Sequence, residues 1–340
     1  MILEKKLSVS ASPHDHSKDT VTRIMLDVII ALVPSLIASI FIFGYRSLLV
    51  TAVSVSSCLV AEFASRVVMK RHQTIGDLSA VVTGVLIAFN VPVSMPLWMV
   101  ALGAVFAIVV VKQMFGGIGM NFVNPALATR IMLIASFPTA MGAWNKPYAW
   151  KMHDADTTAS PLNAIKEIYR NGEITSETFG EHDLPSLVDM LLGNRAGSLG
   201  EVCAVALLIG LVYLLVRRVI KLTIPLSYVG SFAVIMFIAG GFNLRFLAYE
   251  ILAGGLLLGA IFMATDYTTS PINFKGQIIF GIGCGVITAL IRLFGNLPEG
   301  VSFAIILMNI LVPHIEHLTT PKPFGTVKEK KKKEKEGYEG

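Results

Sequence analysis

Charge is scarce in this chain: only 15% of its 340 residues are Asp, Glu, Lys or Arg, whereas an average soluble domain contains about a quarter. Such a composition argues against a soluble globular protein. Hydrophobic residues make up 54% of the chain and fall in blocks of roughly 17 to 22 residues, the length that crosses a bilayer. Short alternating segments typical of membrane β-barrels are lacking. The blocks therefore predict transmembrane helices, which satisfy their backbone polar groups internally.

Cysteine is also scarce. The three cysteines, Cys58, Cys203 and Cys284, lie in separate apolar blocks and form no CxxC pair. A complete iron–sulfur site usually needs about four thiolates, so we do not expect this chain to hold a cluster alone, although a cluster shared with a partner subunit stays open. No CxxCH motif occurs, and no two histidines lie deep in facing spans. We therefore expect neither a haem nor another metal site.

Both ends of the chain are polar. Residues 1–22 do not have the pattern of a cleaved signal peptide, and we interpret them as a cytoplasmic N-terminal segment. Residues 318–340 contain the lysine-rich run from Lys328 to Lys335. Such a run is typical of a disordered, solvated tail near the anionic inner leaflet, or of a simple topology anchor. We expect no nucleic-acid partner.

The apolar blocks predict an all-α, polytopic membrane protein with about ten transmembrane helices. The predicted spans are 24–44, 47–68, 77–92, 95–113, 122–139, 199–217, 223–241, 245–264, 275–294 and 299–317. Lys and Arg gather on the side of both termini, which places the termini in the cytoplasm. The chain then divides into a first membrane half (23–139), an external loop (140–198) and a second membrane half (199–317). A polar loop of this length is usually functional.

The two halves resemble each other weakly. The segments Gly84–Pro92 and Gly255–Asp266 are similar, and each is followed by a second similar block, Lys112–Ala128 and Ile291–Ile306. Because five spans is an odd number, a duplication would place the halves in opposite orientation. This arrangement predicts two inverted five-helix repeats with a site at their interface. Chance similarity between apolar helices is the alternative.

Several spans contain Gly, Pro and Asn where a simple membrane anchor would have Leu. FGGIGMNFVNPA brings Asn121 and Asn124, FGNLPEG brings Glu299, and MATDYTTSP ends an apolar run at Asp266. Irregular backbone at membrane depth is tolerated only where it faces protein or a cavity. We interpret these segments as the surroundings of a bound cofactor or an ion path. Helix packing through small residues is the alternative.

Charged residues within spans need partners, because burying an isolated charge costs several kcal/mol. Most of the charged side chains lie near span ends, where capping or interfacial water accounts for them. Arg130 and Glu250 lie deeper in their predicted spans. Pairing between these two residues is a hypothesis that the sequence cannot test.

The external loop carries HDADTTASPLNAIKEIY, from His153 to Tyr169. Hydroxyl and carboxylate residues crowd just before Ser160 and Pro161. This pattern predicts a turn leading into a short amphipathic helix, with Ser160 as the N-cap and Pro161 at the first helical position. The free N–H groups of a helix N-terminus also bind anions. Both features are compatible with a segment that holds a phosphate.

The segment DADTTASPL resembles the covalent-flavin motif of the RnfD/NqrB family of membrane subunits, D-x-x-[ST]-[GST]-A-[ST]-P-L. Further blocks of the chain resemble blocks of that family in the same order, and the chain length favours the RnfD branch. These blocks are SPHDHSKDTVTRIMLDVIIALVP, FGGIGMNFVNPALA, GNRAGSLGE, FMATDYTTSP and LPEGVSFAIILMNILVP.

The resemblance implies a membrane subunit of an ion-translocating ferredoxin:NAD oxidoreductase in the bacterial cytoplasmic (inner) membrane. Such subunits carry FMN through a phosphoester in the external loop, attached by a flavin transferase, and hold a riboflavin-type flavin non-covalently. They pass single electrons together with other Rnf-type membrane, flavin and Fe–S subunits, coupled to Na⁺ or H⁺ movement. The nicotinamide site is expected in another subunit.

Carried over onto this chain, the motif makes Ser160 the FMN acceptor, with Thr158 as the second choice and no covalent flavin as the third. The family usually has threonine at the acceptor position, but serine offers the same hydroxyl. Asp154, Thr157 and Ala159 complete the motif. Asp154 would align the site for the transferase, or it would simply form an Asx-type turn.

We further expect Asn121, Asn124, Asp266 and Glu299 to line the non-covalent flavin or the ion route. Exchanging Asn124 and Asp266 for alanine should then remove that flavin, and its full retention would exclude the assignment. A secondary transporter or small-solute channel with inverted repeats is an alternative, because broken helices suit that class. A subunit that only scaffolds its partners is a second alternative.

Overall fold

The computed structural model describes residues 20–151, 157–158, 160–171, 184–295 and 299–321. The first membrane half contains α1 (Val21–Phe43), α2 (Tyr45–Val68), η1 (Ile75–Asp77), α3 (Ser79–Phe89), α4 (Leu97–Phe106), η2 (Ala107–Gln113) and α5 (Pro125–Ser136). The connecting loop contains α6 (Pro138–Met141), β1 (Trp144–Asn145), η3 (Ala149–Lys151), β2 (Thr157–Thr158), α7 (Pro161–Asn171) and α9 (Leu187–Leu192). The second half contains α10 (Ala204–Val216), α11 (Thr223–Ala239), α12 (Leu244–Leu252), α13 (Leu256–Leu258), η4 (Gly259–Met263), α14 (Phe274–Phe294) and α15 (Val301–Thr319).

Each of the ten predicted spans contains helix, but the helices differ in length. Within the described residues, α1, α2, α14 and α15 are long and apolar enough to cross a membrane, and a fifth span results if α12 and the α13–η4 segment are counted together. The chain is therefore a multi-pass membrane protein. The other five apolar helices have 10–17 residues each. They are shorter than predicted, because Asn, Pro and Gly end them before the apolar run ends.

Two predictions about regular structure need correction. The predicted span 245–264 is not one straight helix: it bends by 64° between α12 and α13, where Gly254 has a φ of +68° that favours glycine. The fold is also not purely helical, because β1 and β2 form a short antiparallel pair in the loop, with Trp144 opposite Thr158.

Helix α2 shows how the bundle is built for lipid. Its outward side carries exposed apolar side chains, such as Val60 and Phe63. Its inward side carries small and polar residues, such as Ser54, Cys58 and Glu62, which are all fully buried. Lipid solvates the apolar side, whereas small and hydroxyl residues let neighbouring helices approach closely. The interior of this protein is therefore where its polar chemistry is concentrated.

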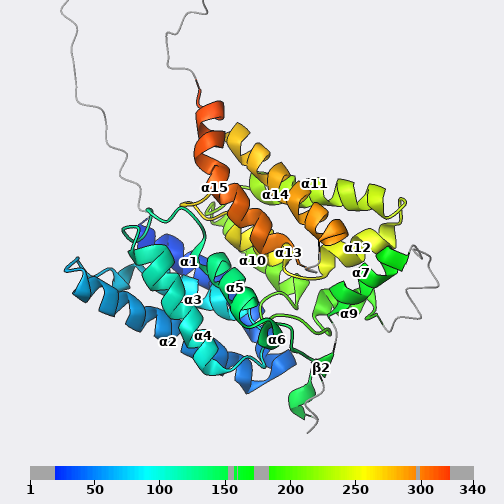
Figure 1. Cartoon of the computed structure of the whole chain (residues 1–340), viewed down its shortest axis with the longest axis horizontal. Coiled ribbons are helices and arrows are strands. Elements are labelled where there is room, and N and C mark those ends of the chain that lie inside the picture. Colours follow the sequence, from blue (N-terminus) through cyan, green and yellow to red (C-terminus); the bar gives the residue numbers. More distant parts are fainter. Residues whose placement is uncertain (1–19, 152–156, 159, 172–183, 296–298, 322–340) are drawn as a thin grey trace, which may run out of the picture.

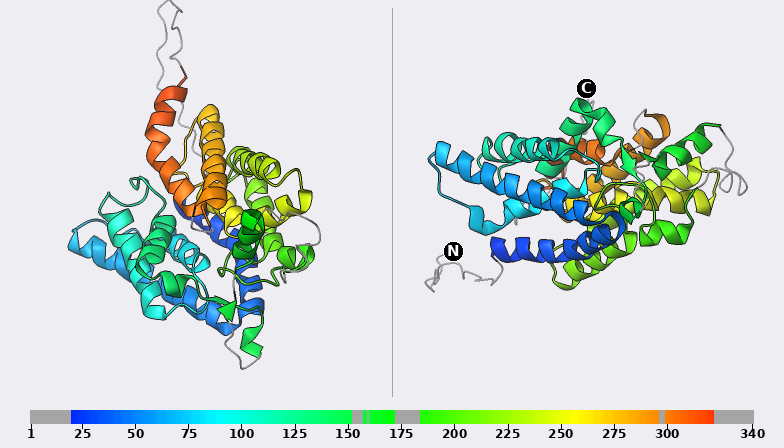
Figure 2. Two further views of the ribbon diagram at one scale, coloured as in Figure 1. Left: turned by 45° about the vertical axis from the view of Figure 1, so that its right-hand side comes forward. Right: turned by 90° about the horizontal axis from the view of Figure 1, so that it is seen from below.

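The helices of the two halves form two groups that meet at α1 and α10 (Figure 1). In the first group α2 packs on α3, α4 and η2; in the second, α11 packs on α14, and α14 packs on α15. Contacts between the groups join α1 to α10 and α5 to α15. The start of α1 and the end of α15 lie toward one side of the bundle, and β2, α7 and α9 lie toward the other, as Figures 1 and 2 show.

The contact between α1 and α10 includes a charged clamp. Asp27 of α1 accepts hydrogen bonds from the Tyr213 hydroxyl (2.9 Å) and from the Arg217 guanidinium (3.1–3.3 Å) at the end of α10. The side chain of Arg217 is 37% exposed, so solvent screens this pair and its contribution to stability is small. The clamp fixes the relative position of the two helices rather than supplying much free energy.

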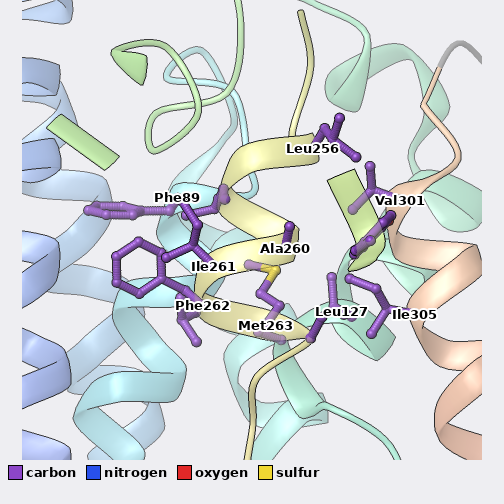
Figure 3. Packing of buried hydrophobic residues seen from close by; sticks show 14 of the residues in the cluster. Phe89, Leu127, Leu256, Ala260, Ile261, Phe262, Met263, Val301 and Ile305 are labelled. Atoms are coloured by element: carbon purple, nitrogen blue, oxygen red, sulfur yellow. The ribbon is translucent and has the colours of Figure 1, made fainter. Parts of the chain in front are cut away.

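The α13–η4 segment lies at the centre of the apolar core. Figure 3 shows it between Phe89 of α3 on one side and Val301 and Ile305 of α15 on the other. Leu256, Ala260 and Ile261 are almost fully buried. An added Cβ at Gly259 would collide with the Val301 side chain, so glycine is required for this close approach. The bend after α12 thus brings the ends of several helices together near the middle of the molecule.

Candidate functional site

A cavity lies between the two membrane halves. Its walls come from α1, α3, η2, α5, α10 and η4, and from the segment that follows η4. The empty space within the cavity, including its open mouth, is about 810 Å³, within the range of about 300–1,000 Å³ for ligand pockets. Most of the wall is apolar, for example Val82, Leu86 and Phe262, and polar groups converge at a few points. Asn121, Asn124 and Asp266 all line it, so the structure brings these three predicted residues together.

Asn124 has a structural task in addition to its place on the wall. Its Oδ1 accepts hydrogen bonds from the backbone N–H groups of Ala126 (3.0 Å) and Leu127 (3.3 Å), so it is the N-cap of α5. Pro125 occupies the first helical position, where its missing N–H costs nothing. The Asn124 Nδ2 lies 3.5 Å from the carbonyl oxygen of Met263, at the end of η4. Asn124 thus joins the start of α5 to the broken helix of the other half.

Asp266 organises the turn that follows η4. Its carboxylate accepts hydrogen bonds from the Thr268 backbone N–H (3.3 Å) and from the hydroxyls of Thr268 (3.1 Å) and Thr269 (3.3 Å). The Thr268 hydroxyl in turn accepts a hydrogen bond from the Asn121 Nδ2 (3.1 Å). Asn121 and Asp266 are therefore linked through one hydroxyl, although 145 positions separate them in the chain.

A residue that the sequence analysis did not select completes this linkage. Asn309 of α15 is buried, and with its amide oriented to suit its neighbours it donates to the Thr269 carbonyl (3.0 Å) and accepts from the Asn124 N–H (3.2 Å). It lies in the middle of the apolar run VSFAIILMNILVP. A lone amide within such a run is a recognisable signal, because polar groups at membrane depth need a partner.

Glu299 lies apart from this cavity. It forms an ion pair with Arg130 of α5, whose side chain is buried. The Arg130 guanidinium also donates to the Asn90 Oδ1 (2.7 Å) at the end of α3. The prediction that Glu299 shares a site with Asn121, Asn124 and Asp266 is thus not what the geometry shows: it belongs to a second polar cluster, which we call the Arg130 cluster (Asn90, Arg130 and Glu299).

The hypothesis that Arg130 pairs with Glu250 is wrong. Glu250 instead pairs with Arg292 of α14 at 2.8 Å, and both side chains are at most 5% exposed. The Arg292 guanidinium also donates to the backbone carbonyls of Glu250 (2.6 Å) and Ala253 (3.2 Å), where α12 ends. A long guanidinium can hold three acceptors at once, so the broken helix and not the other half of the bundle determined this pairing.

Next to these clusters, the segment GNRAGSLGE forms a buried turn before α10. Arg195 donates to the backbone carbonyls of Glu201 (2.6 Å) and Val202 (3.2 Å), and the Glu201 Oε1 accepts from the Ser198 N–H (3.0 Å). Burial lowers the pKa of Arg195 to about 10, and the nearby Glu201 opposes this shift. Arg195 therefore stays charged at neutral pH and fixes the turn.

The loop places Ser160 at the start of α7. The helix begins at Pro161, as predicted, and the backbone carbonyl of Ser160 accepts from the Asn163 N–H (3.0 Å). Thr157 and Thr158 form β2. Asp154 and Ala159 fall outside the described residues. Ser160 is half-buried, between the end of β2 and the start of α7.

Helix α7 is anchored to the second membrane half. The Lys166 Nζ donates to the carbonyl oxygen of Gly295 (2.6 Å) at the end of α14, and the Arg170 guanidinium lies 3.3 Å from the same oxygen. Partial burial lowers the pKa of Lys166, Arg170 adds to this shift, and Glu250 opposes it. Leu162 packs near Gly254 at the bend between α12 and α13. The first turn of α7 thus lies near the Arg292–Glu250 pair.

The chemistry of the cavity fits a planar, amide-rich ring system such as a flavin. Carboxamide and hydroxyl groups gather at one side of the wall, and apolar side chains cover the remainder. Metal binding is a poorer fit, because the described residues contain no group of three His, Cys, Asp or Glu side chains close enough to hold an ion.

Lys112 is the most informative residue that the sequence analysis did not select. It lines the cavity, and its ammonium contacts Glu62 and Ser79. The signal was present in AIVVVKQMFGG, because a lysine within an apolar run needs a buried partner. The identity of that partner could not be read from the sequence.

Comparison with known proteins gives a consistent family. The sequence matches the profile of the NQR2, RnfD, RnfE family over residues 8–325. It is 43% identical to the RnfD subunit of the Na⁺-translocating ferredoxin:NAD⁺ oxidoreductase complex of Acetobacterium woodii, covering 96% of this chain and 98% of that protein. It is 39% identical to the RnfD subunit of the proton-translocating ferredoxin:NAD⁺ oxidoreductase complex of Clostridium ljungdahlii, covering 94% and 96%. Identity to the corresponding subunit of the ion-translocating oxidoreductase complex of Escherichia coli is 33%, covering 93% and 98%. The chain belongs to the NQR2, RnfD, RnfE family.

Proposed function

We propose that this chain is the flavin-carrying membrane subunit of an ion-translocating ferredoxin:NAD⁺ oxidoreductase complex. The observation that carries the proposal is the match to RnfD subunits along almost the whole of both chains. Two of these relatives are named for different ions, Na⁺ and H⁺, so either ion is compatible with this chain. Its partners would be the other membrane, flavin and Fe–S subunits of an Rnf-type complex, and the nicotinamide site would belong to one of them.

Deletion of this chain tests the proposal. Membrane vesicles from cells that lack it should lose NAD⁺-dependent oxidation of reduced ferredoxin and the ion gradient that accompanies it, and the full-length chain should restore both. A purified complex without this chain should also contain less flavin. Retained activity would contradict the proposal, and retained activity with an unchanged flavin content would support a scaffold instead.

The proposed topology has ten spans in two inverted five-helix repeats, in the bacterial cytoplasmic membrane. Helices at equivalent places in the two halves meet each other, α1 with α10 and α5 with α15, as a pseudo-twofold axis in the membrane plane requires. The termini would be cytoplasmic and the loop 140–198 external. The start of α1 and the end of α15 lie on the side opposite α7 and α9 (Figure 1), which supports this assignment.

In the external loop we propose FMN bound through a phosphoester to the Ser160 hydroxyl, attached by a flavin transferase. Two features support it: Ser160 directly precedes α7, whose N–H groups favour a phosphate, and Lys166 adds a cation one turn and a half further along. Covalent attachment would hold a one-electron carrier on the outer face without a tight binding pocket. Thr158 is the other candidate hydroxyl.

In the cavity between the halves we propose a riboflavin-type flavin, bound non-covalently. The apolar wall suits the benzenoid side of such a ring, and Asn121, Asn124 and Asp266 offer hydrogen-bonding groups for its polar edge. Bound there, a flavin supplies one-electron transfer within the low-dielectric layer. The chain itself contributes shape, exclusion of water and fixed hydrogen-bonding groups.

Replacing Asp266 by alanine tests this assignment. The variant is expected to lose non-covalent flavin affinity by about tenfold or more, because one lost hydrogen bond to a charged group costs about 1.5 kcal/mol or more. Acid extraction of the purified complex, which releases only non-covalent flavin, measures the content. Asp266 is preferable to Asn124, because Asn124→Ala also removes the N-cap of α5 at a cost of about 1 kcal/mol.

Glu167→Ala is the matched control, because Glu167 is an exposed carboxylate on α7, away from the cavity. This control should keep its full flavin content. Equal content in Asp266→Ala, Glu167→Ala and the unmodified complex would exclude Asp266 from the flavin site.

A further inference from the structure

Two π-helical segments border the cavity. Segment η2 contributes Lys112, and segment η4 contributes Ile261 and Phe262. π-Helical turns are rare and occur frequently at functional sites, because the extra residue redirects a side chain that a regular helix would place elsewhere. In η2 the redirected region carries the only positively charged side chain among the described residues that line the cavity.

Lys112 is held by a buried network. Its Nζ lies 3.1 and 3.2 Å from the two carboxylate oxygens of Glu62 and 2.6 Å from the Ser79 Oγ. Glu62 also accepts hydrogen bonds from the Thr74 hydroxyl (2.9 Å) and the Gln113 Nε2 (3.0 Å). The side chains of Lys112 and Glu62 are 4% and 0% exposed. Glu62 has enough donors around it to remain a carboxylate, and it therefore keeps Lys112 an ammonium.

The pair is oriented with respect to the cavity. Lys112 and Ser79 line the cavity, whereas Glu62 lies behind them and does not. The positive end of the pair thus faces the empty space, and in a poorly polarisable interior its field is weakly screened. Asp266, the other charged residue of the wall, is already occupied by the hydroxyls of Thr268 and Thr269.

We propose that Lys112 is the residue that compensates the negative charge which an electron brings into this cavity, and that Glu62 and Ser79 hold it in place for this task. The inference rests on the proposed flavin in the cavity. An electron enters from a reduced one-electron carrier of the complex and leaves to the next acceptor, and no bond to the chain forms or breaks. Adding negative charge next to a fixed ammonium is favourable, so Lys112 raises the affinity of the cavity for the reduced ligand relative to the oxidised one.

Lys112→Met in the purified complex tests this role. The ratio of affinities for the reduced and the oxidised ligand should fall by about tenfold or more, which lowers the reduction potential of the non-covalent flavin by about 59 mV for a one-electron couple. The potential is measured by redox titration followed by absorbance, and the signal of the non-covalent flavin is the difference between the complex before and after acid extraction. Lys112→Arg keeps the charge and should retain most of the original potential.

A second variant guards against failure to assemble, because Lys112→Met leaves the buried Glu62 without a partner. The double variant Lys112→Met, Glu62→Gln removes both charges and should show the same downward shift. Flavin bound with an unchanged potential in either methionine variant would overturn the role of Lys112. Absence of any non-covalent flavin from the unmodified complex would instead overturn the proposed cofactor, so the two failures are distinguishable.

Discussion

Ser160→Ala is expected to abolish covalent flavin on this chain completely, because alanine has no oxygen with which to form a phosphoester. The chain is co-produced with its flavin transferase, separated on a denaturing gel and examined under ultraviolet light, where a covalent flavin fluoresces. The fold of the loop should tolerate the change, since the hydrogen bond that starts α7 involves the backbone carbonyl of Ser160. Loss of fluorescence with a normal amount of protein is the predicted result.

Two control variants make this test specific. Ser160→Thr restores the hydroxyl that the family usually has at this position and should keep the fluorescence. Thr158→Ala should also keep it, because Thr158 pairs with Trp144 through the backbone of β2. Fluorescence that survives in Ser160→Ala and disappears in Thr158→Ala would move the attachment to Thr158. An unmodified chain without fluorescence would remove the covalent flavin from the proposal.

Arg292→Met is expected to destabilise the protein by about 3–5 kcal/mol, the cost of removing one partner of a buried ion pair. The change leaves the Glu250 carboxylate and the carbonyl oxygens of Glu250 and Ala253 without this donor. It also removes a guanidinium that lies 4.9 Å from the centre of the Phe232 ring. The expected result is a strongly lowered unfolding temperature of the purified complex and less assembled complex in the membrane.

Arg245→Met is the matched control, because Arg245 is an exposed arginine at the start of the same helix as Glu250. It should change stability by no more than about 0.5 kcal/mol, as is usual for surface positions. The double variant Glu250→Gln, Arg292→Met should recover part of the loss, because it leaves no buried charge uncompensated. Equal unfolding temperatures for Arg292→Met and Arg245→Met would show that the pair does not stabilise the broken helix.

The positions of helices and of the loop motif followed from local information. Apolar runs located α1, α2, α14 and α15 to within a few residues, because a hydrophobic block of sufficient length must form a helix in lipid. The start of α7 followed from Ser160 and Pro161, because capping depends on neighbouring residues only. The bend after α12 was not predicted, since Gly254 lies within an apolar run and glycine alone does not specify a turn.

The cavity was only partly foreseen. Asn121, Asn124 and Asp266 were identified because polar groups interrupted apolar spans, and these three residues do line one space. Glu299 was grouped with them for the same reason, but its partner is Arg130. A single sequence contains the interruptions but not the distances between them.

Composition and local pattern therefore determined that this is a multi-pass helical membrane protein with a hydroxyl-rich motif before a loop helix, because lipid and backbone hydrogen bonding constrain each segment independently. Tertiary structure alone decided which buried charges meet: Arg130 with Glu299, Arg292 with Glu250, and Lys112 with Glu62. These pairs join residues 42 to 169 positions apart. Every buried charge requires a partner, but several partners of equal chemistry were available, and only the packing of the broken helices brings one of them within reach.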